Sequence, residues 1–239
     1  MKKTKILIIK KKKLLWIFLG VLLVITFGLT YFSVKPTSTP KAKYTIVVDA
    51  GHGGMDGGSV GISGSTERVL NLDYAKTLKE YLQNYGFNVV LTRNSLDGLY
   101  KPDSDNIKKD DMLARKEIIE KSNADLIVSI HMNYFPLESA KGAQVFYNPQ
   151  SDVSHALADS IQSVFAANLT MSRPNSEVGD YYMLNCTNVP AVIVECGFLS
   201  NPEEEALLLT EEYRKKVCYY ILCGIVKYYA EVEDFLPDV

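Results

Sequence analysis

The stretch Val189-Pro-Ala-Val-Ile-Val-Glu-Cys-Gly-Phe-Leu-Ser-Asn201 opens as an apolar run and places one carboxylate, Glu195, where that run ends. Two other apolar runs have the same character, Thr45-Ile-Val-Val-Asp-Ala50 and Asp125-Leu-Ile-Val-Ser-Ile130. Short runs rich in β-branched residues are typical of buried β-strands. Three such runs, with helical segments between them, indicate the sheet of an α/β fold.

Each of these three runs leads to a side chain that can bind a metal or transfer a proton. In chain order, they lead to His52 within Gly51-His-Gly-Gly54, to His131 and to Glu195. In an open α/β sheet, ligands bind at the carboxyl ends of the strands. The pattern therefore predicts that two of the chain's three histidines and one carboxylate meet in a single crevice.

The remaining segments alternate between helical and strand-like patterns. Helices are expected at residues 67–85, 112–121, 155–169 and 211–230, and a helix start is expected at Asn201-Pro202. Further strands are expected at 87–92 and 143–147, and a polar surface loop at 95–111. With 47% hydrophobic residues, the chain can form one sizeable core. We expect a single layered α/β domain over residues 44–239, with a mostly parallel, twisted sheet flanked by helices on both faces.

The N-terminal part of the chain differs from this domain in composition. Residues 1–13 are basic, and residues 14–34 form an uncharged apolar run of 21 residues, which is long enough to span a bilayer as a helix. Lysines before such a run predict a cytoplasmic N-terminus and an extracytoplasmic domain at the cell membrane. A cleaved signal peptide is the alternative, but no Ala-x-Ala site follows, which favours a retained anchor. Residues 35–43 contain Pro36 and Pro40 and are expected to be an extended linker.

The distribution of charge along the chain indicates which kinds of molecule the domain can bind. Residues 1–34 carry seven lysines and no acidic residue, which leaves 19 basic residues against 28 acidic ones, about −9, for the rest. This distribution argues against a nucleic-acid-binding surface. An anionic polymer would have to be held by shape and hydrogen bonds, because the net charge of the domain repels it.

The residue types at the strand ends suit zinc hydrolysis. Such sites use three protein ligands and keep a fourth position open for water. His52, His131 and Glu67, which begins a predicted helix, are the candidate ligands. Zinc activates water, and a nearby carboxylate takes the proton and later returns it to the leaving group. Glu195 is the candidate for that role.

Each candidate also has a simpler explanation. The glycine loop around His52 can be a turn, His131 can be a hydrogen-bonded core histidine, and Glu67 can be a helix-cap carboxylate. Asn133 is a candidate for orienting a ligand or binding substrate. Arg173, in a loop before the Glu195 strand, is either a substrate-binding or a solvated residue. The shared position at the strand ends favours the joint site over these separate explanations.

Five blocks of sequence together resemble the zinc-dependent N-acetylmuramoyl-L-alanine amidases, over about residues 44–230. The blocks are Asp49-Ala-Gly-His-Gly-Gly-Met-Asp-Gly-Gly58, Glu67 with Asn71-Leu72, Leu91-Thr-Arg93, Ser129-Ile-His-Met-Asn133 and Pro190-Ala-Val-Ile-Val-Glu-Cys-Gly-Phe-Leu-Ser-Asn201. The resemblance implies one catalytic Zn²⁺ with His52, Glu67 and His131 as ligands and Glu195 as the acid/base residue. The implied substrate is peptidoglycan, cut between the lactyl group of muramic acid and L-alanine of the stem peptide.

More narrowly, the sequence resembles the spore-cortex members of this family. The similarity lies in a lone catalytic domain behind a membrane segment, the long polar stretch before Arg115, Gly142-Ala-Gln-Val-Phe-Tyr147 and Asp180-Tyr-Tyr-Met-Leu-Asn185. It implies removal of stem peptides so that muramic-δ-lactam can form. Gln144 departs from many members, which have Glu there. No wall-binding repeat is recognised in the sequence, and the segment after His131 is too short for the inhibitory helix that division amidases carry. We therefore expect the activity to be controlled by the membrane anchor and by a regulatory or activating protein partner.

Two competing functions remain open at this point. A non-catalytic peptidoglycan-binding scaffold with this fold would lack at least one of the four site residues, and all four are present. A zinc peptidase of similar layering would cut bonds between stem-peptide residues, but the glycine loop and the Glu-Cys-Gly-Phe block favour the amidase.

Overall fold

The computed structural model describes residues 42–233, together with Trp16, Phe18, Leu19 and Leu22. The predicted segments 1–13, 14–34 and 35–43 lie almost entirely outside the described residues. Among the residues that are described, no helix combines the length and the apolar character needed to cross a bilayer. The domain that begins at Ala42 is therefore considered by itself.

The domain is built on one six-stranded sheet with the strand order β2-β1-β3-β6-β4-β5. The strands are β1 (Thr45–Ala50), β2 (Asn88–Leu91), β3 (Leu126–Asn133), β4 (Gln144–Tyr147), β5 (Glu177–Val178) and β6 (Ala191–Phe198). Strands β2, β1, β3 and β6 are mutually parallel, whereas β4 is antiparallel to β6. The expected mostly parallel sheet is thus observed, with its reversal at β4.

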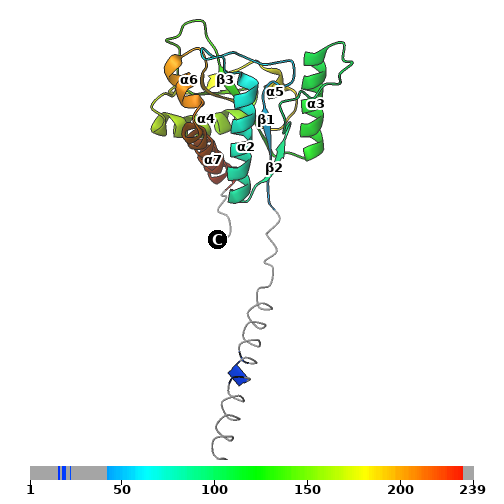
Figure 1. The fold of residues 1–239 in the computed structure, drawn as a ribbon, viewed down its shortest axis with the longest axis vertical. Helices are drawn as coiled ribbons and strands as arrows, with labels where there is room; N and C mark the ends of the chain where they lie inside the picture. Colours follow the sequence, from blue (N-terminus) through cyan, green and yellow to red (C-terminus); the bar gives the residue numbers. More distant parts are fainter. Residues whose placement is uncertain (1–15, 17, 20–21, 23–41, 234–239) are drawn as a thin grey trace, which may run out of the picture. The chain divides into compact units, whose positions relative to one another are not determined.

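Helices cover both faces of this sheet. They are α2 (Glu67–Tyr85), α3 (Ile107–Ser122), α4 (Asp152–Asn168), α5 (Tyr182–Asn185), α6 (Pro202–Leu208) and α7 (Glu211–Glu233). The larger hydrophobic core joins one face of the sheet to α2, α4 and α7. A smaller core joins the opposite face to α3 and α5 (Figure 1). The second face therefore has the thinner cover, and the candidate site lies on that side.

Alternation along each strand assigns the side chains to these two faces. In β1, Ile46 and Val48 belong to the larger core, whereas Val47 belongs to the smaller one. Because successive side chains of a strand point to opposite faces, Asp49 shares the side of Val47. The same rule places Glu195 on the side of Ile193, which also belongs to the smaller core. The polar residues of the strands thus point toward α3 and α5.

Most observed elements match the sequence-based expectations to within four residues at each end. Helix α2 has the expected bounds, and it ends at Gly86, whose φ of 110° is in the left-handed region that glycine tolerates. Helix α3 begins at Ile107, inside the segment expected to be a loop, because the Asn106 side chain accepts a hydrogen bond from the Lys109 amide. The short elements α5 and β5 were not expected, since two to four residues carry no detectable periodicity.

Candidate active site

The three strand ends meet as the sequence predicts. His52 follows β1, His131 lies near the end of β3, and Glu195 lies on β6 as the register partner of His131. After this pair the register shifts, so that Asn133 pairs with Phe198 and β6 contains one extra residue. Such a β-bulge re-aims side chains and is frequent beside active sites.

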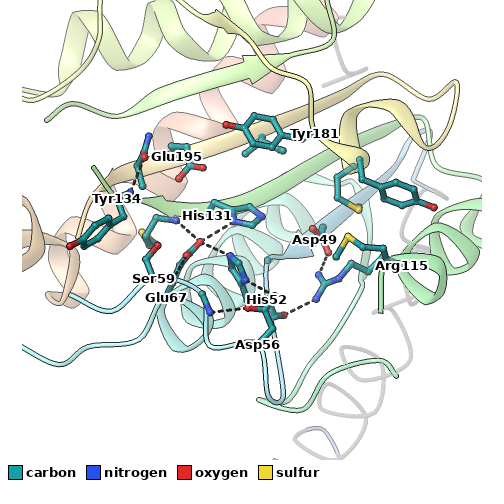
Figure 2. Close-up of a pocket in the computed structure, with 18 of the residues that line it drawn as sticks. Asp49, His52, Asp56, Ser59, Glu67, Arg115, His131, Tyr134, Tyr181 and Glu195 are labelled. Atoms are coloured by element: carbon teal, nitrogen blue, oxygen red, sulfur yellow. Dashed lines mark hydrogen bonds and ion pairs between the residues drawn. The ribbon is translucent and has the colours of Figure 1, made fainter. Parts of the chain in front are cut away.

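His52, Glu67 and His131 form a compact cluster of potential ligands (Figure 2). The Oε1 atom of Glu67 lies 3.2 Å from Nε2 of His52 and 2.9 Å from Nδ1 of His131. One ligand atom from each residue lies within 4.8 Å of the others. Two imidazoles and one carboxylate form a ligand set that zinc hydrolases use. The residues therefore fit a zinc ion by donor chemistry and by spacing.

Further polar contacts surround the side chains of Glu67 and His52. The Ser59 amide donates to Oε2 of Glu67 at 2.8 Å, and the side chain of Asn71 donates to its Oε1 at 3.2 Å. On the other side, Nδ1 of His52 lies 2.9 Å from a carboxylate oxygen of Asp56. A carboxylate behind a histidine is the usual outer partner of a metal ligand, because it fixes the tautomer and the ring orientation.

Interactions within this cluster shift the pKa values of His52 and Glu67. Burial alone would lower the pKa of His52, but Glu67 and Asp56 raise it to about 9. Burial would raise the pKa of Glu67, yet His131 and His52 hold it well below its usual range. The carboxylate is thus ionised and available as a ligand.

The glycines of the β1–α2 loop make room for the ligand side chains. A Cβ atom on Gly51 would lie 2.2 Å from Cε1 of His131, and one on Gly58 would lie 2.5 Å from Oε2 of Glu67. His52 itself has a φ of 61°, which is uncommon for a residue other than glycine. The loop therefore holds a strained backbone at a candidate ligand, a feature that clusters at functional sites.

A buried arginine holds this strained loop in place. Arg115 of α3 is fully buried, and its Nη2 donates to the His52 carbonyl at 2.7 Å. Its Nη1 donates to the Ala50 carbonyl at 2.8 Å and to Oδ1 of Asp49 at 2.5 Å. Its Nε donates to Asp111 at 2.6 Å. Arg115 thus connects two carboxylates with the backbone that carries His52.

Asp49 is the buried anion of this network. Hydrogen bonds from Ser129 and Thr92 reach its carboxylate from β3 and from the end of β2. Burial alone would raise the pKa of Asp49, but Arg115 and the two hydroxyl groups lower it to about 2. The sequence offered a signal for this pair, because a carboxylate inside an apolar strand needs a buried cation.

Arg93 supports the same loop from the other side. Its guanidinium donates to the carbonyls of Ala50 and Gly51 at 2.9 and 2.8 Å, and it is almost completely buried. The side-chain partners of Arg93 are thus backbone carbonyls, whereas those of Arg115 include two carboxylates.

Glu195 has the properties of an acid/base group. Its Oε2 atom is buried and has no hydrogen-bond partner among the described residues. Burial raises the pKa of Glu195 to about 7, and the charge of Glu67 adds to the effect, while His131 and His52 oppose it. A carboxylate with a pKa near neutrality can both accept and return a proton. Figure 2 shows Tyr181 beside Glu195, with its hydroxyl group toward the carboxylate.

The cluster and Glu195 open into one cleft of about 650 Å³. Asn133 and Tyr134 line it at the end of β3, and Tyr181 lines it from the segment before α5. Tyr134 and Tyr181 are 51% and 43% exposed, so both are available to a ligand. Sequence reasoning singled out Asn133 but missed the two tyrosines, because isolated aromatic residues in loops give no positional signal.

Arg173 does not line this cleft. Its guanidinium lies over the ring of Phe198, with Cζ 5.7 Å from the ring centroid. Its backbone amide donates to Ala143 at 3.0 Å. The structure therefore brings together five of the six predicted site residues and places Arg173 elsewhere. His155 lies on the surface, as expected, and stacks on Tyr147.

The sequence of residues 46–227 matches the family model described as N-acetylmuramoyl-L-alanine amidase, Amidase_3. The chain belongs to this family. A germination-specific N-acetylmuramoyl-L-alanine amidase of Bacillus subtilis (strain 168) is 34% identical over 234 residues, which cover 94% of this chain and 98% of that protein. AmiA of Escherichia coli (strain K12), also an N-acetylmuramoyl-L-alanine amidase, is 31% identical over 80% of each chain.

Solved structures of amidases share the fold. The CwlD amidase from Clostridioides difficile, determined in complex with the GerS lipoprotein, superposes with a TM-score of 0.74 at 36% identity, over 79% of this chain and 99% of CwlD. The catalytic domain of CwlV, an amidase from Bacillus (Paenibacillus) polymyxa, gives a TM-score of 0.69 at 31% identity, over 77% and 97% of the two chains. This member of the amidase family is therefore a hydrolase, and peptidoglycan is its supported substrate.

Proposed function

We propose that the chain is a zinc-dependent amidase that cuts the bond between the lactyl group of N-acetylmuramic acid and L-alanine of the stem peptide. The observation that carries this proposal is the convergence of His52, Glu67 and His131 within 4.8 Å, beside Oε2 of Glu195, which has no hydrogen-bond partner among the described residues. His52, Glu67 and His131 would hold the Zn²⁺ ion. When bound, zinc supplies Lewis-acid activation of water and of the substrate carbonyl.

Glu195 performs the proton transfers in this mechanism. As a base, it takes a proton from the attacking water, which forms a bond to the lactyl carbonyl carbon. As an acid, it then gives that proton to the alanine nitrogen while the carbon–nitrogen bond breaks. The products are a lactyl carboxylate and a peptide with a free amino terminus. A group with a pKa near 7 is suited to both steps at neutral pH.

The remaining residues of the site act by positioning. Asp56 and Asn71 fix the orientations of His52 and Glu67, and Arg115 holds the loop that carries His52. We assign Asn133 to substrate binding, because it lines the cleft at the end of β3, the strand that also carries His131. Tyr134 and Tyr181 form the exposed walls of the same cleft.

Two relatives of the chain indicate its biological role. The Bacillus subtilis relative is named for germination, and CwlD was solved with the GerS lipoprotein. These relatives support a role in spore-cortex maturation, in which stem peptides are removed so that muramic-δ-lactam can form. They also support a regulatory or activating protein partner for this chain.

The proposed location rests on the sequence alone. Residues 14–34 would form a membrane anchor or signal, with the basic residues 1–13 in the cytoplasm. The linker 35–43 would then connect this segment to a catalytic domain, residues 44–239, on the extracytoplasmic side. For a spore-cortex enzyme this side corresponds to the forespore intermembrane space.

Product analysis tests the proposed reaction. Peptidoglycan is digested with the zinc-loaded full chain, and the fragments are identified by mass spectrometry. We expect intact stem peptides that begin with free L-alanine, and glycan strands with free lactyl carboxyl groups. Cleavage between stem-peptide residues would indicate the zinc peptidase instead. Binding of peptidoglycan without any cleavage, with and without the protein partner, would indicate the scaffold.

A further inference from the structure

The cleft extends in two directions from the His52–Glu67–His131 cluster. Figure 2 shows Tyr134 on one side of the cluster and Arg115 with Asp49 on the other. The second direction, here called the α3–α5 arm, is lined by Lys108, Met112, Asp180, Tyr182, Met183 and Ile193. None of these six residues has a role in the proton transfers or in holding the metal, so the arm can serve to bind substrate.

The floor of the α3–α5 arm is apolar. Met112, Met183 and Ile193 belong to, or pack against, the smaller hydrophobic core. Helix α3 also contacts α5. Methionine side chains are unbranched and adapt to ligands of irregular shape. The arm therefore suits the small apolar side chain of a peptide.

The exposed ammonium group of Lys108 lies at the α3–α5 arm. Lys108 is exposed and forms no ion pair within the described part of the chain; its charge reaches Asp56, whose pKa it helps to lower. The residues after position 34 carry about nine more acidic than basic side chains. Lys108 is the one lysine among the residues that line the cleft, where Asp56 and Asp180 also lie, and it therefore marks the local position for an anionic group.

We propose that the α3–α5 arm is the stem-peptide subsite and that Lys108 binds the free carboxylate of the acidic residue that follows L-alanine. This inference rests on the proposed amidase function, because the cluster fixes where the scissile bond lies. The alanine methyl group would contact the apolar floor, and the next residue would bring its carboxylate to the mouth. The glycan strand would then run past Tyr134, where the cleft is exposed.

A pair of substrates tests this assignment. The first is N-acetylmuramoyl-L-alanyl-D-glutamate with a free α-carboxylate, and the second is the same molecule with an α-carboxamide. We expect the wild type to favour the carboxylate by roughly tenfold in kcat/KM, mainly through KM, as one charge-assisted hydrogen bond would give. Lys108→Met should remove this preference by raising KM for the carboxylate alone.

Lys109→Met is the matched control. Lys109 is also exposed and lies on the same turn of α3, but it does not line the cleft. The control should keep the wild-type preference. A preference that survives in Lys108→Met, or one that falls equally in both variants, would overturn the assignment of Lys108.

Binding to an inactive protein separates this inference from the proposed function. The two muramoyl dipeptides are titrated into Glu195→Gln, with and without Lys108→Met. A carboxylate preference that disappears with Lys108 supports the subsite even if the wild type cleaves neither molecule, in which case only the proposed reaction fails. Equal binding of the two molecules to Glu195→Gln would overturn the subsite, whatever the wild type cleaves.

Discussion

Glu195 and His131 are register partners on adjacent parallel strands, so their side chains leave the sheet on the same face. His131 turns its Nδ1 toward Glu67, at 2.9 Å from Oε1, and not toward Glu195. Oε2 of Glu195 is left without a hydrogen-bond partner among the described residues. One strand therefore supplies a candidate ligand and its neighbour an available carboxylate, which is the arrangement that water activation requires.

Loss of a ligand should reduce metal binding and metal-dependent stability together. We expect His131→Ala to bind less zinc than one ion per chain and to lose most of the rise in melting temperature that zinc gives the wild type. The reason is that zinc stabilises the folded state only in proportion to its affinity for that state. Metal analysis and thermal unfolding with and without zinc check this. His155→Ala, which removes an exposed histidine outside the site, should behave as the wild type. A full metal content in His131→Ala would contradict the ligand assignment.

Arg115 should contribute more to stability than any surface arginine of the domain. Arg115→Met leaves the buried Asp49 carboxylate without its cation and the His52 carbonyl without a donor. Breaking a buried pair in this way costs about 3–5 kcal/mol. Urea unfolding measures the change. Arg214→Met, at a partly exposed arginine with one ion pair of 4.0 Å, should cost less than about 1 kcal/mol. Similar losses for the two variants would argue against the support role of Arg115.

The sequence predicted five of the six strands and the four central side chains for one physical reason. Apolar β-branched runs identify buried strands, and parallel strands bring their carboxyl ends to one edge. His52, His131 and Glu195 therefore follow from pattern alone. Glu67 follows because a helix start after the β1 loop must lie near the same edge.

The supporting contacts could not be predicted in the same way. The donation from Arg115 to the His52 carbonyl joins residues 63 positions apart, and no local pattern encodes it. The start of α3 depended on one side-chain hydrogen bond at Asn106, within a polar segment. The cleft walls at Tyr181 and Lys108 come from segments whose placement depends on packing against the smaller core.

The raised pKa of Glu195 should make the metal-free protein less stable at high pH. Its pKa is about 7 in the folded protein against 4.5 for an unperturbed glutamate, so the folded state binds this proton more tightly. Stability is therefore lost as pH rises from about 4.5 to 7, and the loss is complete above that range. Glu195→Gln lacks this loss, so it should exceed the wild type by up to about 3 kcal/mol near pH 8. Near pH 4.5 the two proteins should be nearly equal. Urea unfolding of the metal-free proteins at both pH values checks this, and a difference that is independent of pH would contradict it.

Two polar residues near β6 should differ in their effect on substrate binding. Asn133 lines the cleft, whereas Arg173 lies over the Phe198 ring outside it. We expect Asn133→Ala to raise KM about tenfold, as the loss of a substrate hydrogen bond would do. Arg173→Ala should leave KM nearly unchanged and lower the melting temperature, because it removes packing on Phe198. Steady-state kinetics on muramoyl peptides and thermal unfolding distinguish the two effects. A large rise in KM for Arg173→Ala would return this residue to the substrate site.

The most direct test compares the turnover of wild type and Glu195→Gln at equal zinc content, on a muramoyl-L-alanyl peptide, with the released alanine amino group as the signal. Both proteins should bind one zinc ion per chain, because Glu195 is not a ligand in this account. The variant should be slower by about three orders of magnitude, since one group acts as both base and acid. Near-normal turnover of zinc-loaded Glu195→Gln would contradict the account, because the proton would then have to move through another residue.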